Sequence, residues 1–260
     1  MSEPEKPKGR PMPGTTGMGT HEVDVHEYGA EKDGARQKVD ERLFMQLLVF
    51  EVSGDRHAGE VSGELAQALT KAGVASVIYD DVNNPQGLAV LTWSRNPDHF
   101  VTKLRPVLQE ASFRTMRQLP EYTMMGRTYA TGYERELAYW ILERPIEQVN
   151  HEGWDWAVWY PLKRKGPFNR LPGKDQGGIL REHAVIGRAY GEAGLAHDVR
   201  LACFGIDAND NEYVIGLIGQ TLFPLSHVVQ AMRKTRQTAE YMDKMGPFFI
   251  GRVAARTHAS

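Results

Sequence analysis

The sequence predicts an α+β protein built from two copies of one β-α-β-β-α-β unit. Two observations carry this prediction. Segments 78–93 and 201–219 each hold two apolar runs separated by Asn, Asp, Pro or Gly residues, which is typical of paired strands joined by a turn. Each pair is followed by an amphipathic segment and then by an apolar run containing Gly-Arg, at 126–127 and at 251–252.

The predicted elements follow the same order in both halves. The first half has a strand, a helix, a strand pair, a helix that begins at a proline, and a last strand, at 43–52, 57–71, 78–93, 97–109 and 124–129. The corresponding elements of the second half lie at 156–162, 178–190, 201–219, 224–232 and 247–253. This order defines the ferredoxin-like unit, and two such units are expected to pack as a pseudo-symmetric dimeric α+β barrel.

Composition sets broad limits on the class of protein. The 260 residues carry a net charge of −2, so the basic stripe typical of nucleic-acid binders is not expected. A single cysteine suits a reducing compartment, and no apolar run reaches membrane-spanning length, so we expect a cytoplasmic protein. Four prolines among the first thirteen residues predict a flexible N-terminal extension over 1–38, followed by a first domain at 39–150 and a second at 151–260.

The two halves differ most between residues 154 and 200, and this is where we expect a functional site. The segment WDWAVWYPLKRK combines tryptophans, including Trp159, with basic residues, as an apolar pocket with a basic mouth would require. The helix that follows carries His183 on the same face as three apolar residues, Ile179, Ile186 and Tyr190. Such a histidine is either a hydrogen-bonded core residue or an axial ligand of haem iron.

A series of spaced motifs then narrows the alternatives. They read Tyr160-Pro161 with Arg164, Arg170-Leu171-Pro172, Arg181-Glu182-His183 with Gly187-Arg188-Ala189-Tyr190, Gly205-Ile206-Asp207, Met232-Arg233 and Gly246-Pro247-Phe248-Phe249. In this order and spacing, the chain from Tyr160 to Arg252 resembles the chlorite dismutase-like haem proteins, especially the peroxide-dependent coproheme decarboxylases. The first half shares only the fold with them.

The resemblance implies a haem cofactor with its iron and a role for several residues. His183 would be the proximal iron ligand, and Tyr160 the redox-active phenol beside a propionate. Arg164 would pair with a propionate, and we place Trp159 and Arg200 among the cofactor contacts. The bound porphyrin is coproheme, acting as substrate and cofactor, or haem b; hydrogen peroxide is the expected oxidant. The resemblance also implies a homo-oligomer, a pentamer in most relatives of this length.

Three positions depart from the pattern of the resembling proteins. Asp198 stands where chlorite dismutases have a distal arginine, and Arg236 stands where oxygen-forming relatives have a glutamate near the proximal histidine. The linker 144–156 offers His151 alone as a distal histidine. The residue over the iron is therefore Asp198, Arg200, His197 or His151, and strand alternation allows only one parity of the residues 197–200 to face the pocket.

These features favour decarboxylation of coproheme to haem b with peroxide, because an acid over the iron would repel chlorite. A haem b peroxidase or a chlorite dismutase-like enzyme is the alternative within the same family. A non-catalytic haem carrier or sensor is the alternative from another class, and a barrel without cofactor would share only the fold.

Overall fold

The computed structural model describes residues 23–259 and shows the two predicted repeats. The first comprises β3 (Phe44–Val52), α1 (Ala58–Lys71), β4 (Ser76–Asp81), β5 (Gly87–Ser94), the π-helical turn η1 (Phe100–Leu104) continuing into α2 (Arg105–Leu108), and β7 (Met124–Arg127). The second comprises β8 (Trp156–Arg164), α5 (Gly173–Glu192), β9 (His197–Ala202), β10 (Tyr213–Gly219), α6 (Leu222–Met232) and β12 (Phe249–Thr257). The α+β class and its repeated order are confirmed.

Shorter elements decorate these repeats. Around the end of the first repeat lie η2 (Ala111–Phe113), β6 (Met116–Gln118) and η3 (Pro120–Tyr122), and the connection between the repeats holds η4 (Tyr139–Glu143) and α3 (Arg144–Asn150). In the second repeat, α4 (Gly166–Asn169) follows β8, while α7 (Arg236–Tyr241) and β11 (Met242–Met245) connect α6 to β12. Within residues 23–259, no helix combines the length and apolar character needed to cross a membrane.

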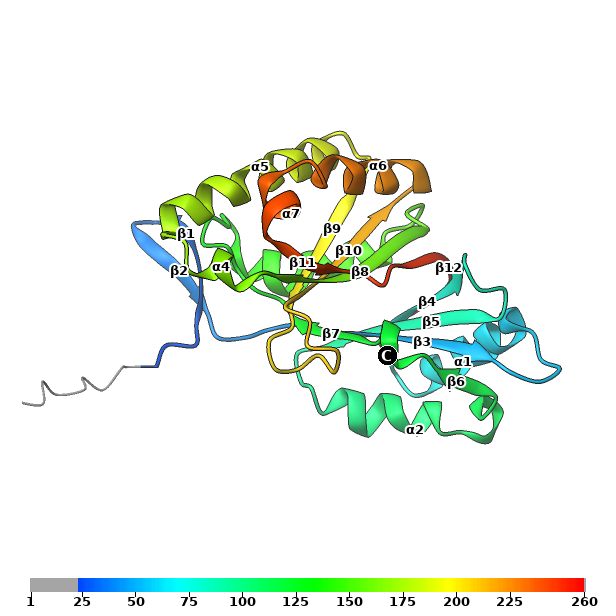
Figure 1. The fold of residues 1–260 in the computed structure, drawn as a ribbon. Coiled ribbons are helices and arrows are strands. Elements are labelled where there is room, and N and C mark those ends of the chain that lie inside the picture. The colour runs from blue at the N-terminus through cyan, green and yellow to red at the C-terminus, as the bar shows by residue number, and fades with distance from the viewer. Residues whose placement is uncertain (1–22, 260) are drawn as a thin grey trace, which may run out of the picture.

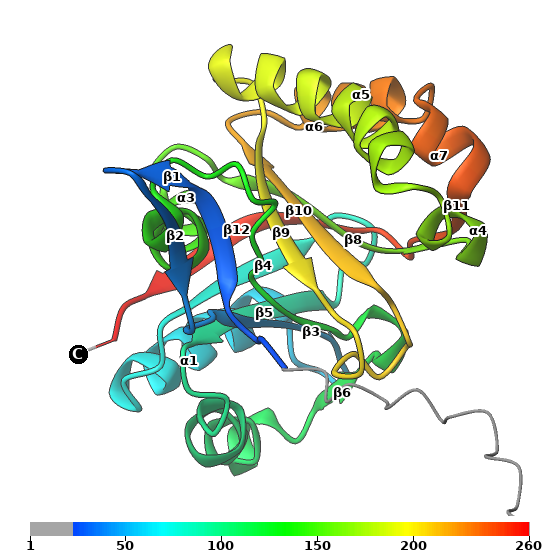
Figure 2. The same ribbon diagram turned by 90° about the vertical axis from the view of Figure 1, so that its left-hand side faces the viewer.

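The strands of the two repeats close into one antiparallel barrel. In the first half they are ordered β7-β3-β5-β4 and in the second β12-β8-β10-β9, which is the same permutation of first, second, third and fourth strand. The halves join where β4 pairs with β12 and where β7 meets β9 at Arg127 and Ala202. Figures 1 and 2 show the resulting layers, with α1 and α2 on the outer face of one half-sheet and α5, α6 and α7 on the outer face of the other.

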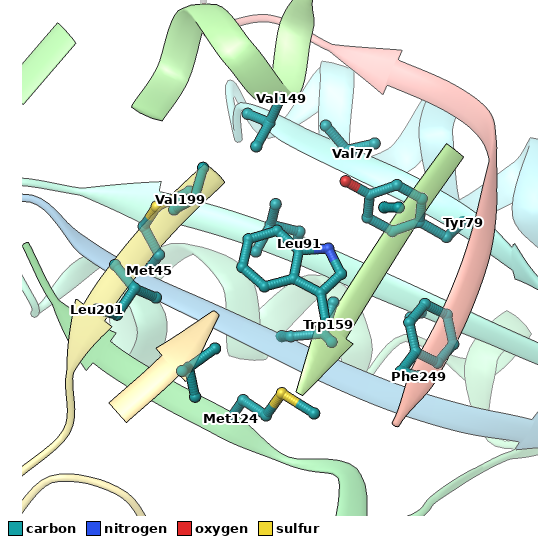
Figure 3. Close-up of a cluster of buried hydrophobic side chains, with 14 of the residues drawn as sticks. Met45, Val77, Tyr79, Leu91, Met124, Val149, Trp159, Val199, Leu201 and Phe249 are labelled. Carbon is teal, nitrogen blue, oxygen red and sulfur yellow. The ribbon is translucent and has the colours of Figure 1, made fainter. Parts of the chain in front are cut away.

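The barrel interior is a packed hydrophobic core. Because side chains alternate along a strand, every second residue of each strand points inward. Met45, Tyr79, Leu91, Trp159 and Phe249 meet there from five different strands, and each is at most 1% exposed (Figure 3). Gly216 on β10 faces Trp159, and a Cβ at that position would lie 2.5 Å from the indole ring. The interior is therefore filled by side chains, and a functional site is to be sought on the outer faces of the sheet.

Residues 27–39, expected to belong to a flexible extension, form a hairpin of β1 (Glu27–Lys32) and β2 (Ala35–Val39). Polar contacts hold it in place together with Val39, which packs against a small apolar cluster of Leu137, Ile141 and Leu142. Glu27 accepts from Arg42 at 3.2 Å and from Arg127 at 3.1 Å, and Gln37 donates to the carbonyl oxygen of Arg135 at 2.8 Å. The expectation came from the polar composition of this stretch, which does not reveal partners distant in sequence. The rest of the predicted extension, residues 1–22, lies outside the described residues.

We expect Gly216→Ala to lower the free energy of unfolding by about 1–3 kcal/mol, because the added methyl group overlaps the buried Trp159 ring. Gly63→Ala on the exposed side of α1 is the matched control. Its Cβ meets nothing within 4 Å, and alanine should stabilise the helix by about 0.5–1 kcal/mol. Urea unfolding followed by circular dichroism measures both; equal effects at the two sites would contradict the packing described here.

Candidate functional site

The outer face of β8, β10 and β9 carries most of the predicted site residues. Tyr160 on β8 is paired with Ile215 on β10, and Ile215 is paired with Arg200 on β9. In the next row, Val158 is paired with Leu217, and Leu217 with Asp198. Directly paired residues point to the same side of a sheet. Tyr160, Arg200 and Asp198 therefore share the face that α5 and α6 cover (Figure 2).

Trp159, which we placed among the expected cofactor contacts, does not share this face. It is one residue from Tyr160 on β8, so strand alternation directs it to the opposite side of the sheet. Its side chain is fully buried in the barrel interior, as Figure 3 shows. An aromatic-rich strand segment does not reveal which of its aromatics faces which layer.

His197 and His151 lie away from the Tyr160 face. His197 alternates with Asp198 on β9 and stacks on Trp154, whose ring centroid is 3.8 Å from that of the imidazole. His151 stacks on the other side of Trp154 at 3.7 Å, so the indole lies between two imidazoles. Of the four residues considered for the distal position, Asp198 and Arg200 share a face with Tyr160.

Two guanidinium groups compensate the charge of Asp198. Arg200 Nε lies 3.0 Å from its Oδ2, while Arg144 donates to its Oδ1 at 3.0 Å and to its carbonyl oxygen at 2.9 Å. Burial alone would raise the pKa of Asp198, but Arg200 and Arg144 outweigh it and hold that pKa below its ordinary value. Asp198 is therefore a carboxylate at neutral pH, and the cluster of Arg144, Asp198 and Arg200 carries a net charge of +1.

Arg164 lies on the same face as Tyr160, four residues further along β8. Its guanidinium stacks 4.5 Å from the ring centroids of Phe168 and Tyr213 and donates to the Tyr213 hydroxyl. Its Nε is buried and makes no hydrogen bond among the described residues, since the closest carboxylate oxygen, Oε2 of Glu212, is 3.7 Å away. A buried donor without a partner is costly, so this side chain is prepared to bind an acceptor.

Tyrosine hydroxyls surround these charges. Burial raises the pKa of Tyr160, whose ring stacks on Phe248 with centroids 4.7 Å apart. Burial also raises the pKa of Tyr129 to about 12, although the nearby Arg200 and Arg164 oppose the shift. Tyr129 packs against Tyr213 with centroids 5.6 Å apart. These phenols remain protonated at neutral pH and can donate hydrogen bonds or hydrogen atoms.

His183 faces the site from the helical layer. It lies in the middle of α5, on the helix face that also carries Ile186 and Tyr190, which pack against the apolar cluster around Tyr160. Its Nδ1 is 2.9 Å from the Thr235 hydroxyl at the start of α7, and its Nε2 is 3.5 Å from the Thr238 hydroxyl. Burial lowers the pKa of His183 to about 4, so the imidazole is neutral at pH 7.

The helix that carries His183 is poorly packed compared with its counterpart in the first half. Of the 14 residues of α1, five are buried, whereas only Ile179 is buried among the 20 residues of α5. A cavity of about 440 Å³ opens between α5 and α6, with Glu182, Ile186 and Thr235 in its lining. Equivalent helices over equivalent half-sheets thus differ in how many of their residues are buried. The lining of the cavity includes none of Tyr160, Arg164, His183 and Arg200, so the cavity lies beside the candidate site rather than within it.

Several residues of this site were not found from the sequence. Arg144 belongs to the connection between the repeats and reaches Asp198 from there. Tyr129 follows the end of β7 in the first half, and Tyr213 begins β10 in the second. Thr235 is adjacent to Arg236, the position that the resemblance marked for a partner of His183, so the spacing indicated the correct turn but not the correct residue.

Comparison with known proteins agrees with this architecture. The sequence model of the chlorite dismutase family matches residues 60–254, which is most of the chain. The fold of the chain, a barrel of two ferredoxin-like repeats, is consistent with this match. The chain therefore belongs to the chlorite dismutase family. No curated protein sequence matches it.

Solved structures share the fold at low sequence identity. TA0507, assigned to the chlorite dismutases, is 17% identical with a TM-score of 0.65, covering 82% of this chain and 95% of that one. A haem-binding protein from Thermus thermophilus is 20% identical with a TM-score of 0.62, covering 82% and 91%. Chlorite dismutase from Candidatus Nitrospira defluvii, in complex with imidazole, is 13% identical with a TM-score of 0.63, covering 81% and 90%.

We expect Arg144→Met to lower the free energy of unfolding by about 1–3 kcal/mol, because it removes hydrogen bonds to the Asp198 carboxylate and carbonyl group in a partly buried site. Arg95→Met is the matched control, since the Arg95–Glu41 pair is more than half exposed and should contribute less than about 1 kcal/mol. Chemical denaturation of both variants makes the comparison. A loss at Arg144 no larger than that at Arg95 would show that the Asp198 cluster is not a coupled unit.

Proposed function

We propose that this chain binds an iron porphyrin between α5 and the outer face of β8, β9 and β10, and that it decarboxylates coproheme to haem b with peroxide. The observation that carries the proposal is that, in the second half, the sheet and helix α5 direct complementary side chains toward each other. A buried phenol, Tyr160, and two arginines occupy the sheet face, and a neutral imidazole, His183, occupies a helix that side chains alone do not pack fully. The haem-binding relative from Thermus thermophilus supports the same class of ligand.

The residues present fit a porphyrin with acidic substituents. His183 is uncharged, and within the described part of the chain the one polar contact of its Nε2 is the 3.5 Å contact with Thr238, so its lone pair is suited to an iron ion. Among the described residues, Nε of Arg164 has an ion-pair contact with Glu212 at 3.7 Å but no hydrogen bond, so it can still donate to a carboxylate. Bidentate pairing with carboxylates is characteristic of arginine. The apolar side chains of the cluster around Tyr160 suit the macrocycle.

When bound, the iron would supply oxidising equivalents taken from peroxide. The role of this chain is then to position the propionates and to move hydrogen. For each propionate converted to a vinyl group, one CO2, one proton and two electrons are released, and one hydrogen peroxide accepts two electrons and two protons to give two waters. Tyr160 would give up its phenolic hydrogen and take one from the propionate β-carbon, while Arg164 and Arg200 hold the carboxylates.

The cluster around Asp198 supports a second candidate activity. An isolated acid on this face would repel an anionic oxidant, but Arg144 and Arg200 leave the cluster with a net positive charge. A chlorite dismutase-type reaction therefore remains the alternative activity. Adding chlorite to the haem b-loaded protein in an oxygen electrode tests it, because rapid oxygen release would support that reaction and its absence would dismiss it.

A peroxide titration of the coproheme-loaded protein tests the proposed reaction. The Soret band and the porphyrin mass are followed together. The proposal predicts stepwise loss of two CO2 units as peroxide is added. Binding without loss of mass would support a haem b peroxidase or a non-catalytic carrier instead, and a protein that does not bind coproheme would overturn the haem assignment altogether.

We expect Tyr160→Phe to abolish decarboxylation, with a rate at least about 100-fold lower, because the ring packing is kept while the transferable hydrogen is lost. Tyr79→Phe is the control. Tyr79 is equally buried but lies inside the barrel, on the far side of the sheet from Tyr160 (Figure 3). Product masses after a fixed peroxide addition measure both variants, and a Tyr160→Phe protein that still forms haem b at the wild-type rate would remove Tyr160 from the reaction.

We expect Arg164→Gln to weaken coproheme binding by about 10-fold, the equivalent of one charged hydrogen bond to a carboxylate. Lys163→Gln is the neighbouring control, because Lys163 points to the opposite side of β8 and pairs with Asp210. Equilibrium titration followed at the Soret band gives both dissociation constants. Similar losses at the two positions would indicate a general effect of charge rather than a carboxylate contact of Arg164.

A further inference from the structure

The hydroxyl group of Thr235 is committed to two partners. Thr235 is the residue that precedes α7, and its side chain is almost fully buried. Its Oγ1 lies 2.8 Å from the carbonyl oxygen of Met232 and 2.9 Å from Nδ1 of His183. Both contacts are within hydrogen-bonding distance, so the number of protons available decides the direction of each bond.

A hydroxyl has one proton, and a carbonyl oxygen can only accept. The contact with Met232 is therefore a hydrogen bond only if Thr235 donates to it. Toward His183, Thr235 can then only accept, and the donor must be an N–H group at Nδ1. The ring nitrogen left without a proton in the neutral imidazole is Nε2.

The hydroxyl group of Thr235 does not cap helix α7. A threonine before a helix commonly accepts a hydrogen bond from a backbone N–H group of the first turn. Thr235 makes no such bond, and the first N–H group of α7, that of Arg236, donates instead to Oε2 of Glu182 at 2.9 Å. Two adjacent residues of α5, Glu182 and His183, thus hold the beginning of α7, one through its backbone and the other through Thr235.

We propose that Thr235 is a positioning residue that holds His183 in the Nδ1–H tautomer and so leaves the Nε2 lone pair for the iron. The proposed tautomer is a property of the ligand-free chain. That Nε2 binds iron rests on the function proposed above. Among the described residues, Nε2 has a single polar contact, the long one to Thr238, which does not compete with a metal bond.

The chemistry of the acceptor has a further consequence. A neutral hydroxyl accepts a weaker hydrogen bond from an imidazole than a carboxylate does, so it transfers less negative charge to the ring. The iron held by His183 should then be easier to reduce than it would be with an acid at position 235. Arg236, the next residue, directs its guanidinium to Glu240 instead of to the imidazole.

The tautomer is tested in the ligand-free protein by correlating side-chain nitrogen-15 and ring-proton resonances at pH 7. We expect the Nδ1–H tautomer of His183 in the wild type and in Thr235→Ser, and loss of that preference in Thr235→Val, which keeps the shape of the side chain. Thr238→Val is the control on the other side of the ring and should leave the tautomer unchanged. An Nε2–H imidazole in the wild type, or the same tautomer in Thr235→Val as in the wild type, would overturn the proposal.

Haem affinity and reduction potential of the haem-loaded protein give a second test. We expect Thr235→Val to weaken haem binding by about 10- to 100-fold, with recovery in Thr235→Ser. The reduction potential should shift downward in Thr235→Asp. If the wild type does not bind haem, the proposed function fails while the tautomer measurement still stands. If the wild type binds haem, and Thr235→Val matches it in affinity while Thr235→Asp matches it in potential, this inference fails and the proposed function survives.

Discussion

Side-chain alternation along β8, β9 and β10 is the constraint on which the rest of the second half depends. The barrel closes, so one parity of each strand must fill a dry interior and the other must face the helices. Trp159, Gly216 and Val199 satisfy the first requirement, and Tyr160, Ile215 and Arg200 the second. A shift of one residue in any of these strands would exchange the two sets, placing charged groups in the barrel and tryptophan on the outer face. The packed interior therefore also determines which polar groups line the candidate site.

The two halves share a topology and differ in what fills the space beside their helices. In the first half, α1 packs buried aliphatic side chains such as Val61, Leu65 and Leu69 against its half-sheet. In the second, α5 is longer but buries far less, and the residues opposite it include a phenol and charged groups rather than aliphatic side chains alone. The two halves thus combine the same strand order with different packing beside their helices.

Most of the fold could be predicted from the sequence, because apolar periodicity, turn residues and the repeated Gly-Arg strand are local signals. The position of His183 on the inner face of its helix follows from the same kind of pattern. The errors arose where several strands or distant segments determine the outcome. The side of the sheet that Trp159 faces depends on register, the contact of Arg144 with Asp198 joins residues 54 positions apart, and the β1–β2 hairpin is held by partners about 100 residues away. Thr235 shows the limit of motif spacing, which led to Arg236, one residue further along the chain.

The proposed function requires His183 to hold an iron porphyrin. The most direct measurement is a Soret titration of the wild type and of His183→Gly with coproheme, in the absence and presence of imidazole. We expect saturation at one porphyrin per chain for the wild type, loss of the histidine-ligated spectrum in His183→Gly, and its recovery when imidazole fills the space left by the side chain. An unchanged spectrum in His183→Gly without imidazole would contradict this role of His183, because another group would then hold the iron and His183 would only pack the helix against its neighbours.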